Sequence, residues 1–417
     1  MICLKTAKAK GRVMVEPSKS MMQRAVAAAL LCDGRSCLRN ISLCDDCVAG
    51  MDVASSLGAE VSTPANNSVL ITGGLKAPSR ELCCGEAGLC IRMYTPIAAL
   101  LDTEVTLTGS GGLTKRPMSM AESPLRALGA RVSTNNGLLP ITVKGPLKGG
   151  EVTLDASMSS QLLSGLLIAC ARARHDSVIN VSSLASKPYI DMTLQVMDAF
   201  GIEYGREGYT RFIVPGGQKY QSRDYTVEGD WSGAAFVLAA GALGGPVTAA
   251  GLRTDTKQAD IAVLQAIEAA GANIDIDADA GEITASRGRL KGFSFDATEC
   301  PDLFPPLTAL AAHCDGVSEI TGVSRLRHKE SDRAAVLQEQ FGRLGVEISL
   351  KNNTMYIIGG TGTGGRINAC GDHRIAMAAA AYACGLEGEM VEIEDPECAA
   401  KSWPGFFEQF GKIGIRH

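Results

Sequence analysis

Several apolar segments of this 417-residue chain begin with a cation, at a point where a helix disfavours one. Lys19, Arg92 and Arg374 each stand near the predicted start of such a helix. The N-terminus of a helix is partially positive, so each cation there costs about 0.3–1 kcal/mol. A group of cations and helix N–H groups is suited to bind a small, highly anionic ligand. The other helix starts carry the residues that capping favours, namely Ser159, Asp230 and Asp302.

Further charged residues stand outside the helix starts. Arg116 lies in the glycine-rich segment GSGGLTKRPMS, Glu330 lies between Lys329 and Arg333, and Lys401 lies in the apolar stretch AAKSWPGFF. The glycine-rich runs do not stand between a strand and a helix, so they do not indicate a dinucleotide site. No P-loop, HExxH or GxSxG pattern occurs.

Two sequence features recur six times along the chain. The first is a short phrase such as LGAEV, which ends an amphipathic stretch and leads into a β-like run. Its glycines, spaced 69 to 74 residues apart, are Gly58, Gly129, Gly201, Gly271, Gly345 and Gly414. The second is a very apolar helix with a polar start, marked at intervals of 68 to 72 residues by Ser20, Arg92, Ser160, Ser232, Asp302 and Arg374. Each phrase predicts a helix closed by glycine and followed by a strand.

Six α/β units of this length predict two similar domains of three units each, in a mixed α/β (α+β) fold. Helices as apolar as GAAFVLAAGAL belong in the middle of a domain, so we expect parallel buried helices inside and sheets outside. Residues 14–228 are expected to form one domain, and residues 1–13 with 229–417 the other, with the active site in the cleft between them. The chain is predicted to change domains near the polar stretch 225–230.

Composition excludes several classes of protein. With 46% hydrophobic and 20% charged residues the chain is globular, and a net charge of −5 argues against a nucleic-acid partner. The longest uncharged run, which ends at Leu252, is broken by Gly244, Gly245 and Pro246, so we expect no membrane span. The N-terminus lacks a secretory h-region, so we expect a soluble cytoplasmic protein. The 14 cysteines are scattered. Cys44 and Cys47 form one C-x-x-C without a second ligand pair, so we expect reduced thiols and no metal.

Ten motifs run in order along the whole chain: PSKSMMQR, AGLCIR, TKRPM, SSQLLSGLL, SKPYIDMT, VEGDWSGA, PDLFPP, HKESDR, GDHRIAMA and DPECAAKSWPGFF. Together they resemble the 5-enolpyruvylshikimate-3-phosphate synthase (3-phosphoshikimate 1-carboxyvinyltransferase) family. The resemblance implies two domains of three βαβαββ units each, the enolpyruvyl transferase fold, which agrees with the count of six. It also implies transfer of the enolpyruvyl group of phosphoenolpyruvate to the 5-hydroxyl of 3-phosphoshikimate in aromatic amino acid biosynthesis. Phosphate is released, no cofactor is needed, and a monomer is expected.

The resemblance also implies roles for individual residues. Asp302 and Glu330 are implied as the acid–base pair, with Lys19 as a third catalytic group. The implied ligands of phosphoshikimate are Lys19, Ser20, Arg24, Ser159, Ser160, Gln161, Ser186, Tyr189, Asp302 and Lys329. The implied ligands of phosphoenolpyruvate are Lys19, Gly88, Arg116, Gln161, Arg333, Arg374 and Lys401.

This chain departs from the family pattern at three places. The segment usually written N-A-G-T-A-x-R reads EAGLCIR from Glu86, Arg325 stands where an asparagine is usual, and the P-G-S-K motif reads EPSK. Two rival interpretations remain. The sister transferase that acts on UDP-N-acetylglucosamine typically has a loop cysteine, which GSGGLTKRPMS lacks. A ring-forming clamp would spread basic residues over one face and would not need Glu330 between two cations.

Overall fold

The computed structural model describes residues 1–5, 8–64, 66–327 and 329–414, and these form two compact units. The first unit is Pro17–Val227, and the second combines Met1–Glu16 with the chain from Glu228 onward. Both chain crossings lie within three residues of the predicted domain boundaries at 14 and 228. Residue 328 of the HKESDR motif and residues 415–417, which end the sixth repeat phrase, lie outside the described residues.

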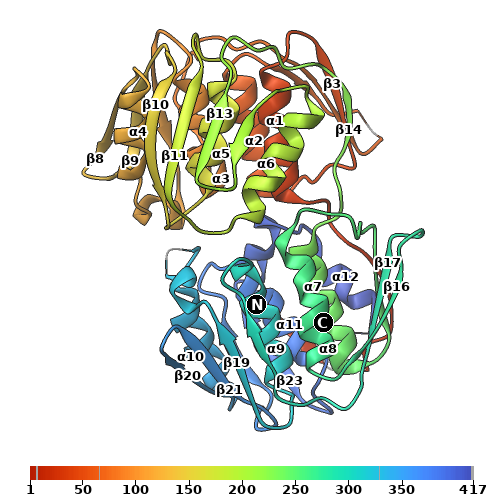
Figure 1. Cartoon of the computed structure of the whole chain (residues 1–417). Coiled ribbons are helices and arrows are strands. Elements are labelled where there is room, and N and C mark those ends of the chain that lie inside the picture. Colours follow the sequence, from red (N-terminus) through yellow and green to blue (C-terminus); the bar gives the residue numbers. More distant parts are fainter. Residues whose placement is uncertain (6–7, 65, 328, 415–417) are drawn as a thin grey trace. The chain divides into compact units, whose positions relative to one another are not determined.

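The first unit contains three four-stranded sheets of identical topology (Figure 1). In each sheet the first two strands are parallel, and the other neighbouring strands are antiparallel. In spatial order the sheets are β14 (Asp224–Thr226), β3 (Arg35–Arg39), β5 (Ser68–Thr72), β4 (Glu60–Ser62); β6 (Leu82–Cys83), β7 (Glu104–Thr108), β9 (Leu138–Lys144), β8 (Arg131–Asn135); and β10 (Gly150–Ala156), β11 (Ser177–Leu184), β13 (Arg211–Val214), β12 (Gly205–Glu207).

The second unit repeats this topology, with one sheet of three strands. Its sheets are β2 (Gly11–Met14), β15 (Val247–Ala250), β17 (Glu282–Ser286), β16 (Asn273–Asp277); β18 (Ser294–Asp296), β19 (Val317–Thr321), β21 (Thr354–Ile358), β20 (Glu347–Lys351); and β22 (Gly365–Asn368), β23 (Met390–Glu394), β1 (Ile2–Lys5). Strands β14, β2 and β1 come from distant parts of the chain, so the first, fourth and last repeats are each completed by a segment outside their own sequence period.

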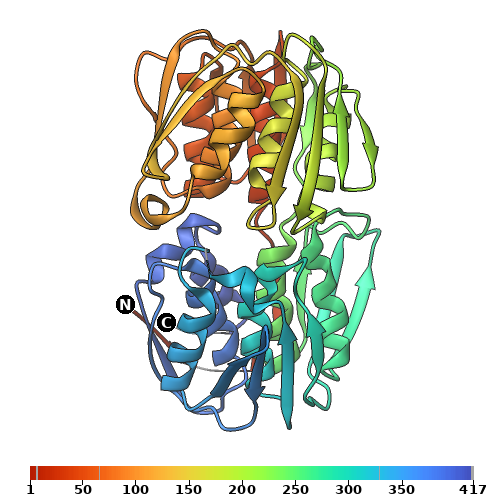
Figure 2. The same ribbon diagram turned by 60° about the vertical axis from the view of Figure 1, so that its left-hand side comes forward.

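Six buried helices follow the first strands of the six sheets: α1 (Lys19–Leu30), α3 (Gly88–Ala98), α5 (Gln161–Cys170), α7 (Trp231–Gly244), α9 (Phe304–Ala311) and α11 (His373–Ala383). The remaining helices are α2 (Asp45–Ser56), α4 (Glu122–Ala127), α6 (Pro188–Ala199), α8 (Val263–Ala269), α10 (Arg333–Arg343) and α12 (Phe406–Lys412). Every residue of α7 from Trp231 to Leu243 except Ser232 is buried, as its lack of a polar face predicts. In Figure 2 the sheets again lie outside these helices within each unit. No helix among the described residues has the length and apolarity needed to cross a membrane.

The six repeat glycines all have a left-handed backbone, with φ between 73° and 107°. After Gly271, for example, the amide of Ala272 donates to the carbonyl of Ile267, which is the Schellman pattern that ends a helix. Residues with a Cβ rarely adopt this conformation, so the period of glycines marks the ends of helices. The predicted helix–glycine–strand unit is confirmed at the first five positions, and at Gly414 the helix and the glycine are confirmed, while the residues that follow it lie outside the described ones.

A test of this role is Gly271→Ala, which places a Cβ about 2.4 Å from the carbonyl oxygen of Arg289 on a backbone with φ of 86°. We expect a loss of about 1–3 kcal/mol in the free energy of unfolding, measured by urea denaturation. The control is Gly342→Ala in α10, where no atom lies within 4 Å of the new Cβ, and which should not be destabilised. Equal stability of the two variants would contradict the role of Gly271.

Candidate active site

Lys19 is the first residue of α1, and its charge is balanced by a carboxylate that sequence reasoning missed. Its Nζ lies 2.9 Å from Oδ2 of Asp46 in the first turn of α2, and the side chains are 14% and 8% exposed. The thiol of Cys47 donates to the carbonyl oxygen of Lys19 at 3.9 Å. The first turn of α2 therefore holds the predicted catalytic lysine. An aspartate near the start of a helix can be recognised in the sequence, but the cation with which it pairs cannot be inferred from spacing.

Arg24 contacts two of the other predicted phosphoshikimate ligands, Ser20 and Tyr189, although its guanidinium is enclosed. Its Nη1 donates to the carbonyl oxygen of Ser20 at 2.7 Å, and its Nη2 donates to that of Tyr189 at 3.1 Å. Its Nε donates to Oγ1 of Thr193 at 2.8 Å. Burial lowers the pKa of Arg24 to about 10, so the side chain remains charged at neutral pH. Arg24 thus joins α1 to α6 and positions the backbone around Ser20 and Tyr189.

The predicted serines lie at the edges of α5 and α6. Ser160 is the residue before α5, but the hydroxyl of Ser159 accepts the hydrogen bond from the backbone amide of Gln161, at 3.2 Å. The capping role predicted for Ser159 is therefore confirmed, one residue earlier than the N-cap position. Ser186 has φ of 58°, which is uncommon for a residue with a side chain and occurs often at functional sites.

Arg92, Arg116 and Gln161 come together around the N-terminus of α3. Arg92 donates from Nη1 to Oε1 of Gln161 at 2.7 Å and from Nη2 to the carbonyl oxygen of Pro117 at 3.3 Å. The prediction that Arg92 occupies a helix start is wrong, because α3 begins at Gly88 and Arg92 lies one turn inside it. Arg92 therefore lies next to the predicted ligands Arg116 and Gln161. The free-energy cost that we predicted for a cation at a helix N-terminus does not apply to it.

Gly88 provides the space that these side chains need. A Cβ at this position would lie 2.7 Å from Nη1 of Arg116 and 3.4 Å from Nη1 of Arg92. We expect Gly88→Ala to displace Arg116 and to raise the KM for phosphoenolpyruvate by about tenfold or more, since small misplacements cost large factors. The KM for 3-phosphoshikimate is the internal control. An unchanged KM for phosphoenolpyruvate would show that Arg116 does not bind it.

In the second unit, Arg333 joins three carboxylates at the start of α10. Its side chain is fully buried and lies 2.9 Å from Asp372, 2.8 Å from Asp302 and 2.5 Å from Glu330. Sequence reasoning did not identify Asp372, which is fully buried and contacts Arg333 through two of its nitrogens. Carboxylates and guanidinium groups in such a geometry form strong, directional ion pairs. Arg333 therefore fixes the positions of Asp302 and Glu330, the predicted acid–base pair.

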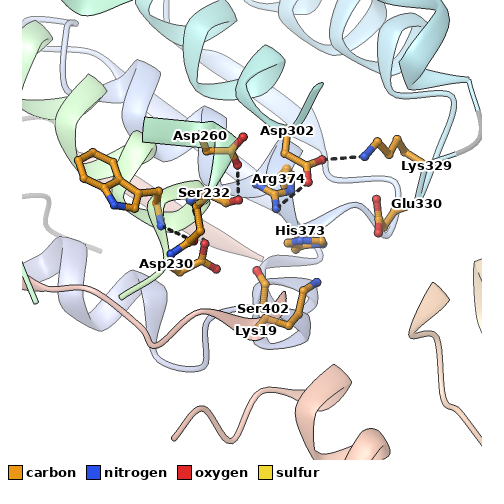
Figure 3. Close-up of polar contacts among 12 residues, drawn as sticks. Lys19, Asp230, Ser232, Asp260, Asp302, Lys329, Glu330, His373, Arg374 and Ser402 are labelled. Carbon is orange, nitrogen blue, oxygen red and sulfur yellow. Dashed lines mark hydrogen bonds and ion pairs between the residues drawn. The ribbon is translucent and has the colours of Figure 1, made fainter. Parts of the chain in front are cut away.

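Asp302 is the centre of this cluster, since three cations contact its carboxylate. Figure 3 shows two of them, Lys329 and Arg374. Lys329 lies 3.1 Å from Oδ1, and Arg374 lies 3.2 Å from Oδ2. Burial opposes the charge of Asp302, but the positive charges of Arg374, Lys329 and Arg333 hold its pKa well below the ordinary range. Asp302 is therefore anionic at neutral pH and can only accept hydrogen bonds.

Of the two helix caps predicted in this unit, Asp302 needs correction and Asp230 is confirmed. Asp302 lies in the 3-10 turn Pro301–Leu303 before α9, and its carboxylate contacts cations instead of capping that helix. Asp372 caps α11 by accepting from the amide of Arg374 at 3.1 Å, so the cation at this helix start is compensated. The cap predicted for Asp230 is confirmed, because its carboxylate accepts from the amide of Ser232 at 2.9 Å.

Lys401 ends the 3-10 segment Pro396–Lys401 and is buried, with 6% of its surface exposed. Burial of an ammonium group costs free energy, which favours a functional role for Lys401 over that of an ordinary surface charge.

His373 is the first residue of α11 and is 1% exposed. Among the described residues no group of three or more His, Cys, Asp or Glu side chains is placed to hold a metal ion.

The sequence and the structure both match known proteins over nearly the whole chain. The family model of EPSP synthase (3-phosphoshikimate 1-carboxyvinyltransferase) matches residues 4–410. The 3-phosphoshikimate 1-carboxyvinyltransferase of Clostridium kluyveri is 35% identical, covering 99% of this chain and 97% of that protein. The one of Thermococcus kodakarensis is 37% identical, covering 99% and 100%.

A solved structure of EPSP synthase from Acinetobacter baumannii, at 2.37 Å, superimposes with a TM-score of 0.82. It is 27% identical and is covered over 98% of its length, against 99% of this chain. The two-domain α/β fold with buried helices and outer sheets is therefore the enolpyruvyl transferase fold. By sequence and by structure, this chain belongs to the EPSP synthase family.

Proposed function

We propose that this chain transfers the enolpyruvyl group of phosphoenolpyruvate to the 5-hydroxyl of 3-phosphoshikimate and releases phosphate. In this reaction the hydroxyl oxygen replaces phosphate on the enolpyruvyl carbon, and the hydroxyl proton is lost. Family membership supports this proposal, and the ion cluster around Asp302 is the structural observation that carries it. The reaction belongs to aromatic amino acid biosynthesis, and we propose a cytoplasmic monomer without a cofactor or a nucleic-acid partner.

The cations around Asp302 and Lys19 are proposed to bind the phosphate and carboxylate groups of the substrates. Each is paired with a protein carboxylate, at distances of 2.8 to 3.2 Å. An anionic substrate would compete with Asp302 and Asp46 for these positive charges. The pKa of Asp302 would then rise toward its ordinary value, which suits it to accept the hydrogen of the 5-hydroxyl.

The remaining predicted ligands are proposed to complete the two substrate shells. For phosphoshikimate these are Ser20, Arg24, Ser159, Ser160, Gln161, Ser186, Tyr189 and Lys329. For phosphoenolpyruvate they are Gly88, Arg116, Gln161, Arg333, Arg374 and Lys401. Glu330 is proposed to transfer protons, since its carboxylate is held by Arg333 at 2.5 Å and its side chain remains 15% exposed.

The proposal is tested by measuring phosphate release with both substrates, with each alone, and with UDP-N-acetylglucosamine in place of phosphoshikimate. Release is expected only with phosphoenolpyruvate and phosphoshikimate together. Release with the nucleotide sugar instead would favour the sister transferase, and no release with any combination would contradict the proposal.

A variant with a matched control tests the role of Lys401. We expect Lys401→Ala to raise the KM for phosphoenolpyruvate by about tenfold or more, because a buried charge contact to an anion is worth more than 1.4 kcal/mol. Lys412→Ala, at an exposed position in α12, should behave as the wild type. Wild-type kinetics in Lys401→Ala would remove Lys401 from the site.

A further inference from the structure

Asp260 is a buried carboxylate next to the candidate site that none of the proposed roles uses. It lies in the 3-10 turn Ala259–Ala262, and its relative exposure is 2%. Its Oδ2 accepts the hydrogen bond of the Ser232 hydroxyl, in the first turn of α7. Its Oδ1 is buried and meets no hydrogen-bond donor among the described residues. A buried carboxylate oxygen without a donor is costly when it is charged.

The charged and titratable groups around Asp260 come from three neighbouring elements. Asp302 precedes α9, Asp230 caps α7 and Arg374 lies in the first turn of α11 (Figure 3). The thiol of Cys300 stands at the start of the 3-10 turn that contains Asp302. Burial and the negative charge of Asp302 raise the pKa of Asp260 to about 7, although Arg374 and the Ser232 hydroxyl act in the opposite direction. Arg374 is thus paired with Asp302, which is charged at neutral pH, and is also subject to the charge of Asp260, which titrates near neutral pH.

We propose that Asp260 is a positioning residue that controls the charge around Arg374 and takes up a proton when an anion binds there. This inference rests on the proposed assignment of Arg374 to phosphoenolpyruvate. With Asp260 charged, Arg374 faces an additional negative charge, which competes with the anionic substrate. With Asp260 protonated and neutral, the positive charge of Arg374 is balanced only by Asp302 and the substrate. Neutral Asp260 then needs no cation beside it.

The sign of the pH dependence follows from linkage. A bound anion beside Arg374 makes the charged form of Asp260 less favourable, so binding raises its pKa above about 7 and takes up a proton. Affinity for phosphoenolpyruvate is then highest below pH 7 and falls as the pH rises through the pKa of the unliganded protein. Because binding takes up only one proton, the affinity for phosphoenolpyruvate falls by at most about tenfold per pH unit.

The experiment measures kcat and KM for phosphoenolpyruvate from about pH 6 to about pH 8.5, at saturating phosphoshikimate. In the wild type, KM should rise about 3- to 10-fold more over this range than in Asp260→Asn, which is neutral at every pH and still accepts from Ser232. Comparing the two proteins cancels the titration of the substrate. Asp255→Asn is the control, because Asp255 is exposed, and it should retain the wild-type profile. Identical profiles of the wild type and Asp260→Asn would overturn the proposal.

Ser232→Ala provides a second test, because a purely structural role of Asp260 would leave the pH dependence of KM unchanged. The Ser232 hydroxyl lowers the pKa of Asp260, so its removal should shift the rise of KM to higher pH. Loss of stability without this shift would contradict the proposal. Calorimetry of phosphoenolpyruvate alone, in two buffers that differ in ionisation enthalpy, should show proton uptake by the wild type and none by Asp260→Asn. Because this measurement needs no turnover, it separates failure of the inference from failure of the proposed reaction.

Discussion

Glu330→Gln should reduce kcat by about 10²- to 10⁴-fold, the range expected when a group that transfers a proton is lost. The Glu330 carboxylate accepts from Nη2 of Arg333 at 2.5 Å, and a glutamine oxygen can retain that hydrogen bond. The substitution therefore removes the titratable group and leaves the local geometry. The two KM values should change little, since Glu330 is not proposed to bind either substrate.

The measurement is phosphate release under saturating substrates, with circular dichroism to confirm the fold. Glu339→Gln is a matched control, because Glu339 lies on α10 and pairs with Arg343 at the surface. It should leave kcat unchanged. A loss of less than about tenfold in Glu330→Gln would demote Glu330 to a positioning residue.

Arg333→Met should destabilise the fold by about 3–5 kcal/mol, because it leaves buried carboxylates without their cation. Asp372 is fully buried and lies 2.9 Å from Nε of Arg333, and Asp302 lies 2.8 Å from Nη1. Urea denaturation at neutral pH measures the loss. Arg343→Met on the same helix is the control. Arg343 is half exposed and pairs with Glu339 at the surface, so its removal should cost less than about 1 kcal/mol.

The loss in Arg333→Met should shrink in acid. The pKa of Asp302 is held below its ordinary value by Arg374, Lys329 and Arg333 against the effect of burial. A lowered pKa contributes stability above the ordinary aspartate pKa of about 3.9, and this contribution is lost as the pH falls through the native value. Wild type and variant should therefore converge at low pH. A difference that is independent of pH would mean that packing, not charge, stabilises this cluster.

The sequence alone was sufficient to predict the six repeats and their buried helices. Glycine is required wherever a helix ends in the left-handed conformation, so the period of Gly58, Gly129 and Gly201 continues through all six units. Helices without a polar face, such as α7, must be enclosed by other elements. These are local rules, and they can be applied without knowing which segments meet.

The pairing of charges across the fold was decided only by the tertiary structure. Lys19 meets Asp46 across 27 residues of sequence, and Arg333 meets Asp372 across 39. Residues at such separations are brought together by the packing of helices and sheets, and no spacing rule specifies their distance. Arg92 illustrates the same limit of sequence reasoning. Helix α3 begins one turn before Arg92, so the cost predicted for a cation at a helix start does not apply to this residue.

The completion of the first and fourth repeats was equally a matter of tertiary structure. Strand β14 pairs with β3 in parallel register, with Asp224 opposite Cys37, and β2 pairs with β15, with Gly11 opposite Val247. Local sequence determined where helices end and which helices are buried, because backbone conformation and hydrophobicity act over a few residues. Long-range packing decided which strands complete each sheet and which carboxylates balance Lys19, Arg333 and Arg374, because ion pairs and strand pairing depend on distance in space.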